Sequence, residues 1–259
     1  MSIHPTAIID SSAEIGANVL IGPYCVVGAD VRIGDGTELG PHVILQGKTW
    51  IGEQCRFCGH TAIGIDPQDL RYRGEPTRLQ IGSRNVFREF VTISRGTPHG
   101  GGLTLIGDDG LFMACSHVGH DARVGSYVIF ANAATLAGHV EVADHAQIGA
   151  FSAVHQFCRV GPHAFIGGYS VVTRDALPYV KTVGNRGDAK IYGINTIGLQ
   201  RKGFPAGSIK ELKQLYRILF RSQLNTRDAL AKAKETEWTV PEVDIMIRFI
   251  ETSKRGFMG

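Results

Sequence analysis

The sequence lacks the segments that direct a chain into or across a membrane. Its N-terminus shows no basic region followed by an apolar stretch, and nowhere do 18 apolar residues run together. The five cysteines are odd in number, and the lone CxxC of Cys55 and Cys58 has no second pair to complete a zinc site. We therefore expect a cytoplasmic protein with reduced thiols and no integral membrane segment.

The sequence also lacks the marks of nucleic-acid binding. Its basic residues are not interleaved with stacking aromatics, and no Walker-type glycine loop is present. The net charge of +3 is modest but uneven, because residues 1–172 carry 11 basic and 15 acidic groups whereas residues 173–259 carry 16 and 9. The basic end suggests an acidic partner, although a solvated helical surface would explain the charge equally well.

What the sequence does contain is a repeat of six residues. An aliphatic or aromatic residue occupies every sixth position over 3–63, 81–93 and, shifted by one, 106–172, and a small residue commonly follows four positions later. A period of six fits neither a helix nor a continuous strand, but it fits short strands joined by turns in a coil that stacks on itself. The sequence therefore predicts an all-β solenoid with three hexapeptides per coil and coils ~4.8 Å apart.

Two segments interrupt the repeat without ending it. They span residues 65–80 and 98–105, and insertions of this kind are typical of functional loops. We predict a parallel β-helix over residues 1–172 with both loops inserted.

The six-residue period ends at Val172, and helical patterns follow. Helices are expected from Pro205, over about 226–234, and from Pro241. We predict a connector and a helical domain over residues 173–259, which caps the open end of the solenoid.

Nine of the ten histidines lie in the repeats, and none occupies an inward position. Because one coil is 18 residues long, His120, Gly138 and Gln156 fall in one column on successive coils, with Asp121 and His139 in the next. A histidine suits a general base, which contributes about 10² to 10⁴ in rate, and the Asp121 carboxylate would orient it. The Gly138 N–H could stabilise an oxyanion. Since no serine or cysteine nucleophile motif stands nearby, direct acyl transfer is favoured.

The other histidines divide into two groups. His117 and His155 belong to the predicted cluster around His120. The remaining five in the repeats are expected to be ordinary surface residues: His4, His42, His60, His145 and His163.

Over essentially its whole length the chain resembles the UDP-N-acetylglucosamine 3-O-acyltransferases, which begin lipid A assembly. The matching segments are DPQDLRYRGEPTR (66–78), RGTPHGGGLT (95–104), SHVGHD (116–121), NAATLAGHV (132–140), HQFC (155–158) and RKGF (201–204). The resemblance implies a left-handed β-helix, a homotrimer with active sites between neighbouring prisms, and an acyl chain delivered by acyl carrier protein to a UDP-amino sugar. It implies no cofactor and no metal.

The resemblance also implies roles for individual residues. His120 would be the general base, Asp121 its partner and Gly138 the oxyanion-stabilising amide. Phe165 and Gly168 match positions that set acyl length. The remaining residues would hold the sugar, its phosphates or the donor: Gln68, Asp69, Arg71, His117, His139, His155, Gln156, Asn195 and Arg201.

Three departures from the family pattern lie near the sugar and the nucleotide. Arg71 replaces a common lysine, Ser94 stands where some members carry histidine, and Ile197 stands where some carry glutamate. The segment 185–195 is also about two residues longer. These differences raise the alternative that the acceptor is the 3-amino analogue, which would give an amide product.

Two readings come from other classes of protein, and a third is a sister enzyme of the same pathway. A zinc hydratase of the γ-carbonic-anhydrase type also places histidines on a left-handed β-helix, but it gives the QDL loop and the RKGF segment no role. A non-catalytic scaffold would make the histidines surface decoration. The sister N-acyltransferase usually has an additional N-terminal domain, whereas Ile3 is already in phase with the repeat.

Overall fold

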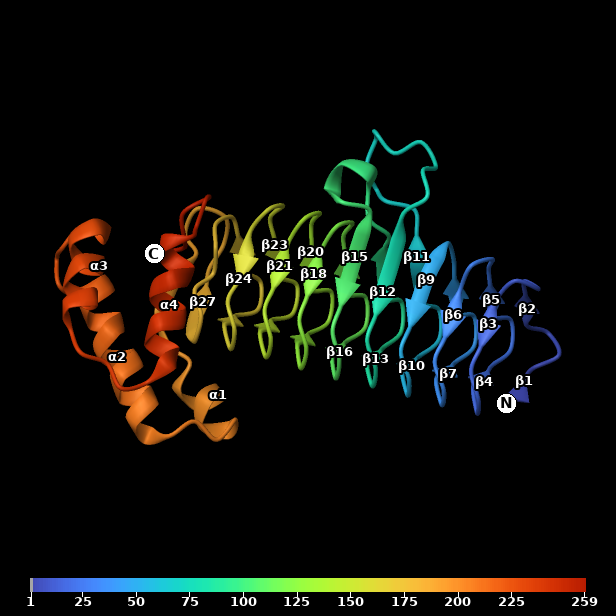
Figure 1. Ribbon diagram of the computed structural model, residues 1–259, viewed down its shortest axis with the longest axis horizontal. Coiled ribbons are helices and arrows are strands. Elements are labelled where there is room, and N and C mark those ends of the chain that lie inside the picture. The colour runs from blue at the N-terminus through green and yellow to red at the C-terminus, as the bar shows by residue number, and fades with distance from the viewer. Residues whose placement is uncertain (1) are drawn as a thin grey trace.

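The computed structural model describes residues 2–259 as a triangular prism of stacked coils followed by a group of helices (Figure 1). Each coil contributes one short strand to each of three sheets, and all pairings inside the prism are parallel. The predicted left-handed parallel β-helix with a C-terminal helical domain is confirmed.

We call the three sheets A, B and C. Sheet A contains β1 (Ser2–Ile3), β4 (Leu20–Ile21), β7 (Glu38–Leu39), β10 (Arg56–Phe57), β13 (Val86–Phe87), β16 (Leu111–Phe112), β19 (Ile129–Phe130), β22 (Gln147–Ile148), β25 (Phe165–Ile166), β27 (Val180–Val183) and β28 (Lys190–Ile194). Sheet B contains β2 (Ile8–Ile9), β5 (Val26–Val27), β8 (Ile44–Leu45), β11 (Ala62–Ile65), β14 (Thr92–Ser94), β17 (His117–Val118), β20 (Thr135–Leu136), β23 (Ala153–Val154) and β26 (Val171–Val172). Sheet C contains β3 (Glu14–Ile15), β6 (Arg32–Ile33), β9 (Lys48–Ile51), β12 (Arg78–Ile81), β15 (Leu103–Ile106), β18 (Arg123–Val124), β21 (Glu141–Val142) and β24 (Arg159–Val160).

The core of the prism consists of the residues that recur every sixth position. Phe57, Phe87, Phe112 and Phe130 are at most 1% exposed and stack along sheet A with ring centroids 4.7, 4.7 and 4.9 Å apart. The small residues four positions later, such as Ala122 and Ala134, are fully buried at the corners. The six-residue period therefore assigned the inward positions correctly, because a corner leaves room only for a small side chain.

At all three corners of the coils the backbone adopts the left-handed conformation, in most cases without glycine. Asp121 has φ 59° and His139 has φ 61°, and the His139 N–H donates to the His120 carbonyl of the preceding coil at 2.9 Å. A side chain in this region of φ is normally unfavourable, and the ladder of hydrogen bonds between coils holds it there. Outward side chains consequently form columns 18 residues apart.

Both loops project from the same edge of the prism (Figure 1). The first joins β11 to β12 through residues 66–77, and the second joins β14 to β15 through residues 95–102 and contains the 3₁₀ turn η1 (Pro98–Gly100). The predicted loops end at residues 80 and 105, but strands β12 and β15 already begin at Arg78 and Leu103, three residues earlier than the period predicts.

The chain after residue 172 first extends sheet A and then forms helices. Strand β27 pairs parallel with β25 and antiparallel with β28. The helices are α1 (Thr196–Arg201), α2 (Ala206–Arg221), α3 (Thr226–Glu235) and α4 (Pro241–Glu251). The three expected helices are confirmed as α2, α3 and α4, and the short α1 was not predicted.

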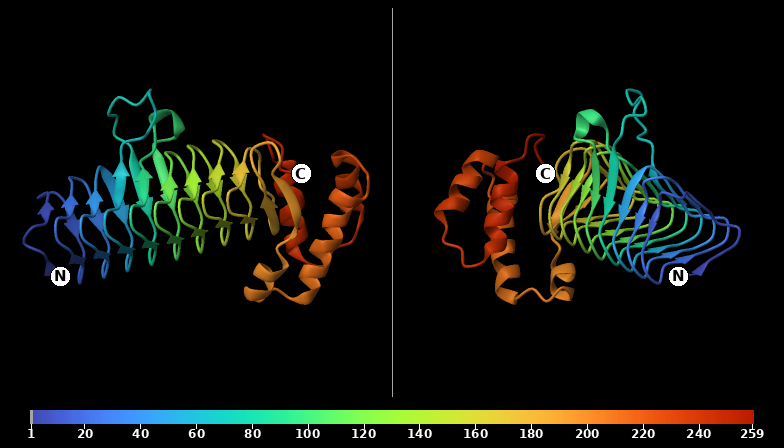
Figure 2. Two further views of the ribbon diagram at one scale, coloured as in Figure 1. Left: turned by 180° about the vertical axis from the view of Figure 1, so that it is seen from behind. Right: turned by 45° about the vertical axis from the view of Figure 1, so that its right-hand side comes forward.

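The helices cover the C-terminal end of the prism, as both views in Figure 2 show. Their apolar faces form a second hydrophobic cluster that includes Leu212, Leu215 and Met246, while Met258 joins the core of the prism itself. These separate clusters support the domain division that we propose at residue 172. No helix within residues 2–259 is long and apolar enough to cross a membrane.

Candidate active site

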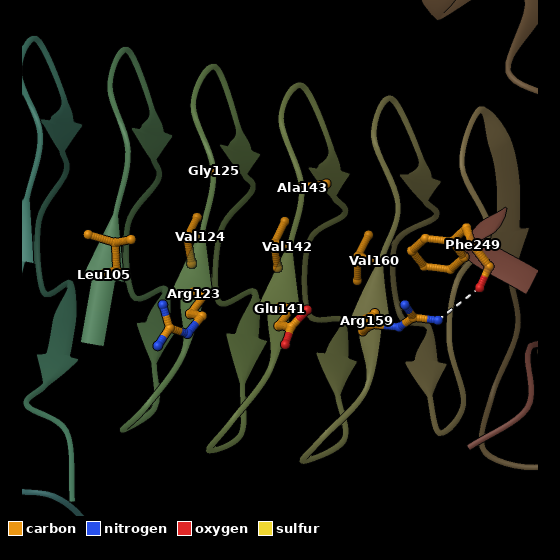
Figure 3. Close-up of a pocket in the computed structure, with 10 residues that line it drawn as sticks. All are labelled: Leu105, Arg123, Val124, Gly125, Glu141, Val142, Ala143, Arg159, Val160 and Phe249. Carbon is orange, nitrogen blue, oxygen red and sulfur yellow. Dashed lines mark hydrogen bonds between the residues drawn. The ribbon is translucent and has the colours of Figure 1, made fainter. Parts of the chain in front are cut away.

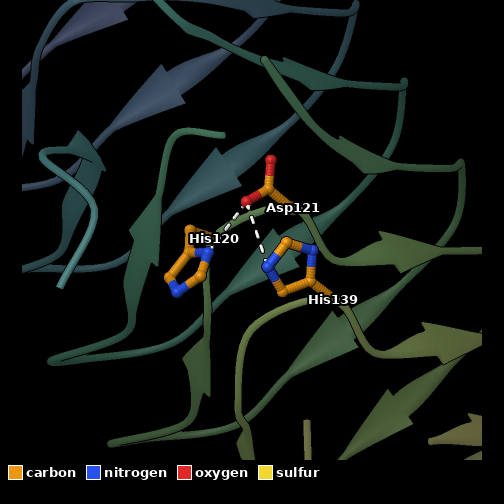
Figure 4. Close-up of side chains that lie close together, drawn as sticks. All are labelled: His120, Asp121 and His139. Atoms are coloured by element: carbon orange, nitrogen blue, oxygen red, sulfur yellow. Dashed lines mark hydrogen bonds and ion pairs between the residues drawn. The ribbon is translucent and has the colours of Figure 1, made fainter. Parts of the chain in front are cut away.

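The predicted histidine–aspartate pair forms at the corner between β17 and β18. The Nδ1 atom of His120 lies 2.8 Å from Oδ2 of Asp121, whose side chain is only 1% exposed (Figure 4). An ionised carboxylate can only accept a hydrogen bond, so Nδ1 carries the proton in this contact. The Nε2 atom of a neutral His120 is then unprotonated and can act as a base.

The Asp121 carboxylate is held by donors on both oxygens. Its Oδ1 accepts the Thr97 N–H at 2.8 Å, and its Oδ2 accepts the Thr97 hydroxyl at 2.6 Å. Burial alone would raise the pKa of Asp121, but the hydrogen bonds from His120 and Thr97 outweigh it and hold that pKa below its ordinary value. The carboxylate therefore stays ionised beside His120 at neutral pH.

Two further imidazoles adjoin the pair. His139 packs edge-on against His120 at 5.1 Å, stacks on Phe157 at 4.4 Å, and brings Nε2 within 3.7 Å of Asp121 Oδ2. Burial lowers the pKa of His139, although Asp121 opposes this shift. Burial also lowers the pKa of His117, whose Nδ1 lies 2.8 Å from the Thr92 hydroxyl. Both rings are therefore neutral at pH 7 and available as hydrogen-bond partners.

Gly138 lies against the His120 ring on the next coil, as the 18-residue period predicts. A Cβ atom on Gly138 would lie 2.4 Å from Cε1 and 2.6 Å from Nε2 of His120, so no larger residue fits without displacing the ring. Within residues 2–259 no backbone acceptor takes the Gly138 N–H. This donor is free to bind an oxygen beside His120.

The two loops place further predicted residues above this corner. Asp69 accepts hydrogen bonds from the Arg71 backbone and guanidinium and lies 3.0 Å from Nε2 of His99. These donors, with those of Arg71 the strongest, hold the pKa of Asp69 well below its usual range. Because His99 contacts Asp69 and Thr97 of the same short turn contacts Asp121, the loop carrying Gln68, Asp69 and Arg71 lies beside the histidine cluster.

The remaining predicted residues do not join this cluster within one chain. Asn195, Arg201 and Phe165 line a cavity of about 570 Å³ on sheet A, together with Lys181 and Lys202. The cluster around His120 instead lies at the corner between sheets B and C.

His155, Gln156 and Gly168 occupy the later coils. His155 and Gln156 are exposed, and His155 Nδ1 lies 3.5 Å from the Arg255 guanidinium. A Cβ on Gly168 would lie 3.3 Å from the Ala150 carbonyl oxygen, a tight contact that a shift of a few tenths of an ångström would relieve.

Sequence reasoning missed several groups near the cluster. A cavity of about 390 Å³ is lined by His139 and Phe157 together with Arg159, Lys254 and Arg255. The last two lie in the C-terminal tail, and no repeat relates them to His139. Thr97 and His99 were within a matched segment but were assigned no role.

His145 and His163, which were expected to be ordinary surface residues, are partly buried. Their rings stack at 4.5 Å in a column that Tyr127 and Tyr179 extend. Burial lowers the pKa of His145, and it lowers that of His163 to about 4. The burial arises partly from Phe204, which meets the His163 ring edge-on and belongs to the non-repeating tail.

A prism of hexapeptide coils that carries a histidine paired with a buried aspartate, beside a free glycine N–H, defines a hexapeptide-repeat acyltransferase. Residues 12–47 match the family described as bacterial transferase hexapeptide, and residues 175–258 match the family described as UDP-N-acetylglucosamine O-acyltransferase, domain 2. Full-length relatives named acyl-[acyl-carrier-protein]–UDP-N-acetylglucosamine O-acyltransferase are 46–49% identical to this chain, which therefore belongs to that family.

Full-length relatives support this membership. The enzyme of that name from Alkalilimnicola ehrlichii is 49% identical and covers 99% of this chain and 98% of its own length. The one from Thermodesulfovibrio yellowstonii is 48% identical over 98% of both. Solved UDP-N-acetylglucosamine O-acyltransferase structures from Acinetobacter baumannii and Moraxella catarrhalis are 41% and 42% identical, match over 100% of both chains, and have TM-scores of 0.96 and 0.95.

Proposed function

We propose that this chain transfers an acyl group from acyl carrier protein to the 3-hydroxyl of UDP-N-acetylglucosamine, the first step of lipid A biosynthesis. The observation that carries this proposal is the buried Asp121 carboxylate, which fixes His120 through Nδ1 and leaves Nε2 as the base. The names of the full-length relatives supply the two substrates.

The residues at this corner account for each proton and bond of the transfer. The sugar oxygen attacks the thioester carbon while His120 Nε2 takes the hydroxyl proton, and Asp121 stabilises the imidazolium that results. The Gly138 N–H binds the oxyanion of the tetrahedral intermediate. Collapse of the intermediate breaks the carbon–sulfur bond, and the departing thiolate takes the proton from His120.

Substrate contacts are proposed for the residues around the pair. Gln68, Asp69 and Arg71 on the first loop would hold the sugar, because Asp69 contacts His99 of the turn that also contacts Asp121. His117, His139, His155 and Gln156 would contact the sugar, its phosphates or the donor's arm.

A homotrimer would bring the two separate halves of the site together. One chain places its base at the corner between sheets B and C, but places Asn195, Arg201 and Phe165 around a cavity on sheet A. A neighbouring prism packed through sheet A could present that cavity to His120. Asn195 and Arg201 would then bind phosphate, for which a guanidinium is suited, and Phe165 and Gly168 would limit the acyl chain.

The 3-amino alternative is not favoured. The relatives are named for UDP-N-acetylglucosamine. Ser94, one of the three residues that suggested an altered acceptor site, is only 1% exposed and lies within β14.

The test is single-turnover transfer from hydroxyacyl-acyl carrier protein, with UDP-N-acetylglucosamine and its 3-amino analogue offered separately. We expect an ester product, and we expect His120→Ala to lower kcat at least about 10²-fold with an unchanged melting temperature. His42→Ala, at an exposed histidine of an earlier coil, is the matched control and should keep full activity. An active His120→Ala enzyme would refute this mechanism.

The zinc hydratase is tested in the same preparation. Within residues 2–259, one group offers ligand atoms that all lie within 4.8 Å of one another, and it consists of His120, Asp121 and His139. Zinc hydratases of this fold use three imidazoles, whereas this group has two and a carboxylate. We expect acyl transfer to survive chelator treatment and the protein to lack stoichiometric zinc, and zinc-dependent activity would contradict the proposal.

A further inference from the structure

The second loop touches both carboxylates of the site through one short turn. Thr97 immediately precedes η1 and contacts Asp121, while His99 within η1 contacts Asp69. Resting on the proposed function, we propose that Thr97 is a positioning residue that orients the general base through Asp121, and that His99 positions the sugar-binding Asp69. The turn would thereby fix the acceptor relative to the base.

Thr97 is built into the site as a donor. Its side chain is fully buried, and its N–H and hydroxyl donate separately to the two oxygens of Asp121. The same hydroxyl accepts the Gly100 N–H at 3.2 Å, and the Asp121 N–H donates to the Thr104 hydroxyl at 2.9 Å. Four hydrogen bonds thus fix the carboxylate and its support, which leaves Oδ2 aimed at His120.

Gly100 closes the opposite side of the carboxylate. A Cβ at Gly100 would lie 2.1 Å from Cγ of Asp121 and 2.2 and 2.3 Å from its two oxygens. The glycine is therefore required by the closeness of the turn to Asp121. Thr97 and Gly100 together form a cradle into which this carboxylate fits.

The same turn anchors the first loop. His99 lies one residue beyond Pro98, whose ring restricts the backbone between the two contacts. Two residues before Thr97, the buried Arg95 guanidinium donates to the Gly64 carbonyl, to Asp66 and, at 3.1 Å, to the Tyr72 hydroxyl. At the other end of the loop the Gly96 N–H donates to the Arg78 carbonyl at 3.2 Å, so residues 95–99 hold both ends of the loop that carries Asp69.

The hydroxyl of Thr97 has a defined effect on the base. The hydroxyl donates to Oδ2 and partly neutralises its negative charge. Without it, the full charge of Oδ2 would act on His120 and stabilise the imidazolium. Removal of the hydroxyl also makes Asp121 easier to protonate. Both effects reduce, at low pH, the fraction of enzyme in which His120 is neutral and Asp121 is ionised. Of the other titratable or charged groups, His139 acts directly on Asp121, and His120 itself acts on His117. Arg71 and His99 act on His139.

The first experiment compares Thr97→Val, which has the same shape without a donor, with Thr97→Ser, which keeps the hydroxyl. We expect Thr97→Val to lower kcat at least about tenfold and to move the acid limb of the kcat/KM profile to higher pH. Thr97→Ser should stay within about threefold of the parent with its acid limb in place. Equal behaviour of the two variants, or an unmoved acid limb in Thr97→Val, would overturn the proposal.

If Thr97→Val fails to fold, Gly100→Ala tests the same contact with Asp121 from the other residue of the turn. Its added methyl meets the carboxylate directly, so we expect a similar fall in kcat with secondary structure retained by circular dichroism. Full activity of Gly100→Ala would contradict the claim that Thr97 and Gly100 hold the Asp121 carboxylate in place.

The second half of the proposal is tested at His99. Removal of its contact in His99→Ala should raise KM for the nucleotide sugar about tenfold while kcat and the acid limb stay near those of the parent. His99→Gln keeps a donor near the position of Nε2 and should recover most of that loss. A KM unchanged in His99→Ala would remove His99 from the proposal.

The activity of the parent enzyme distinguishes a failure of the proposed function from a failure of the role proposed for the turn. If it fails to transfer the acyl group at all, the proposed function is wrong. If it is active but the variants behave as the parent does, only the role of the turn is wrong.

Discussion

At the scale of single residues, the column of rings at one corner links folding to pH. His163 stacks between His145 and Tyr179, and its other neighbours include Phe204 and the charged Lys202 and Asp144. Burial, aided by His145 and Lys202, lowers its pKa to about 4 from an ordinary value of 6.5. The imidazole is therefore neutral in the folded protein under conditions that charge it in the unfolded chain.

This difference predicts acid sensitivity. Between about pH 6.5 and pH 4, His163 binds a proton in the unfolded chain but stays unprotonated in the folded protein. The free energy of unfolding therefore falls as the pH is lowered. His163→Phe keeps the stack without titrating and should weaken that dependence, as measured by urea denaturation at pH 7.5, 6 and 5. Some dependence should remain because His117, His139 and His145 also have lowered pKa values. An identical slope in the variant and the parent would show that His163 does not contribute.

The histidines show which neighbours a sequence repeat can predict and which it cannot. His120, Asp121, Gly138 and His139 were placed together from the sequence because an 18-residue coil fixes which residues become neighbours. The burial of His163 could not be predicted, since Phe204 approaches from outside the repeat. Thr97 and Arg255 were missed for the same reason, because an irregular loop and a tail follow no period.

At the scale of elements, one arginine fastens α4 to the prism. Arg159 on β24 binds the Asp175 carboxylate at 2.9 Å, donates to the Thr252 hydroxyl at 3.0 Å and to the Phe249 carbonyl at 2.9 Å, and lies over the Phe249 ring. Figure 3 shows Arg159 in the groove on sheet C, reaching Phe249 at its end. The Asp175 side chain is 1% exposed and also accepts the Ser253 hydroxyl at 2.8 Å.

Breaking this contact should loosen the tail. Arg159→Met leaves the buried Asp175 carboxylate without its counterion and should cost about 3–5 kcal/mol of unfolding free energy. The control is Glu38→Gln in the exposed Arg56–Glu38 pair, whose atoms lie 3.8 Å apart, and it should cost under about 1 kcal/mol. Urea denaturation followed by circular dichroism measures both, and equal losses would contradict the assigned role of Arg159.

The helices themselves were largely predictable. Helix α2 follows Pro205, α3 is capped by the Asn225 side chain and α4 has proline in its first turn, all of which are local signals. Helix α1 has six residues and no such pattern, and β27 and β28 lack the six-residue period because β28 runs antiparallel to β27.

At the scale of the whole molecule, the charge asymmetry bears on the donor. The exposed Lys254 and Arg255 line the cavity beside His139, and they belong to the positive half of the chain. An acidic carrier protein that docks there is attracted through water, and salt screens such attraction. We expect KM for acyl-acyl carrier protein to rise several-fold between about 50 and 300 mM NaCl with little change in kcat. Transfer from acyl-pantetheine, which lacks the carrier, is the control, and a similar salt effect on both donors would count against the contact.

The stacking of coils also constrains how the chain can change in length over evolution. Phe112 pairs with Phe130 after 18 residues, whereas Phe57 pairs with Phe87 after 30 and Phe87 with Phe112 after 25, because the two loops bulge out at a corner. A gain of one residue inside a strand would turn every later side chain to the wrong face, but the gain or loss of a whole coil would leave all columns aligned. Related chains can therefore lengthen the prism only by whole coils. Each coil added after His120 would move the C-terminal helices ~4.8 Å farther from that histidine.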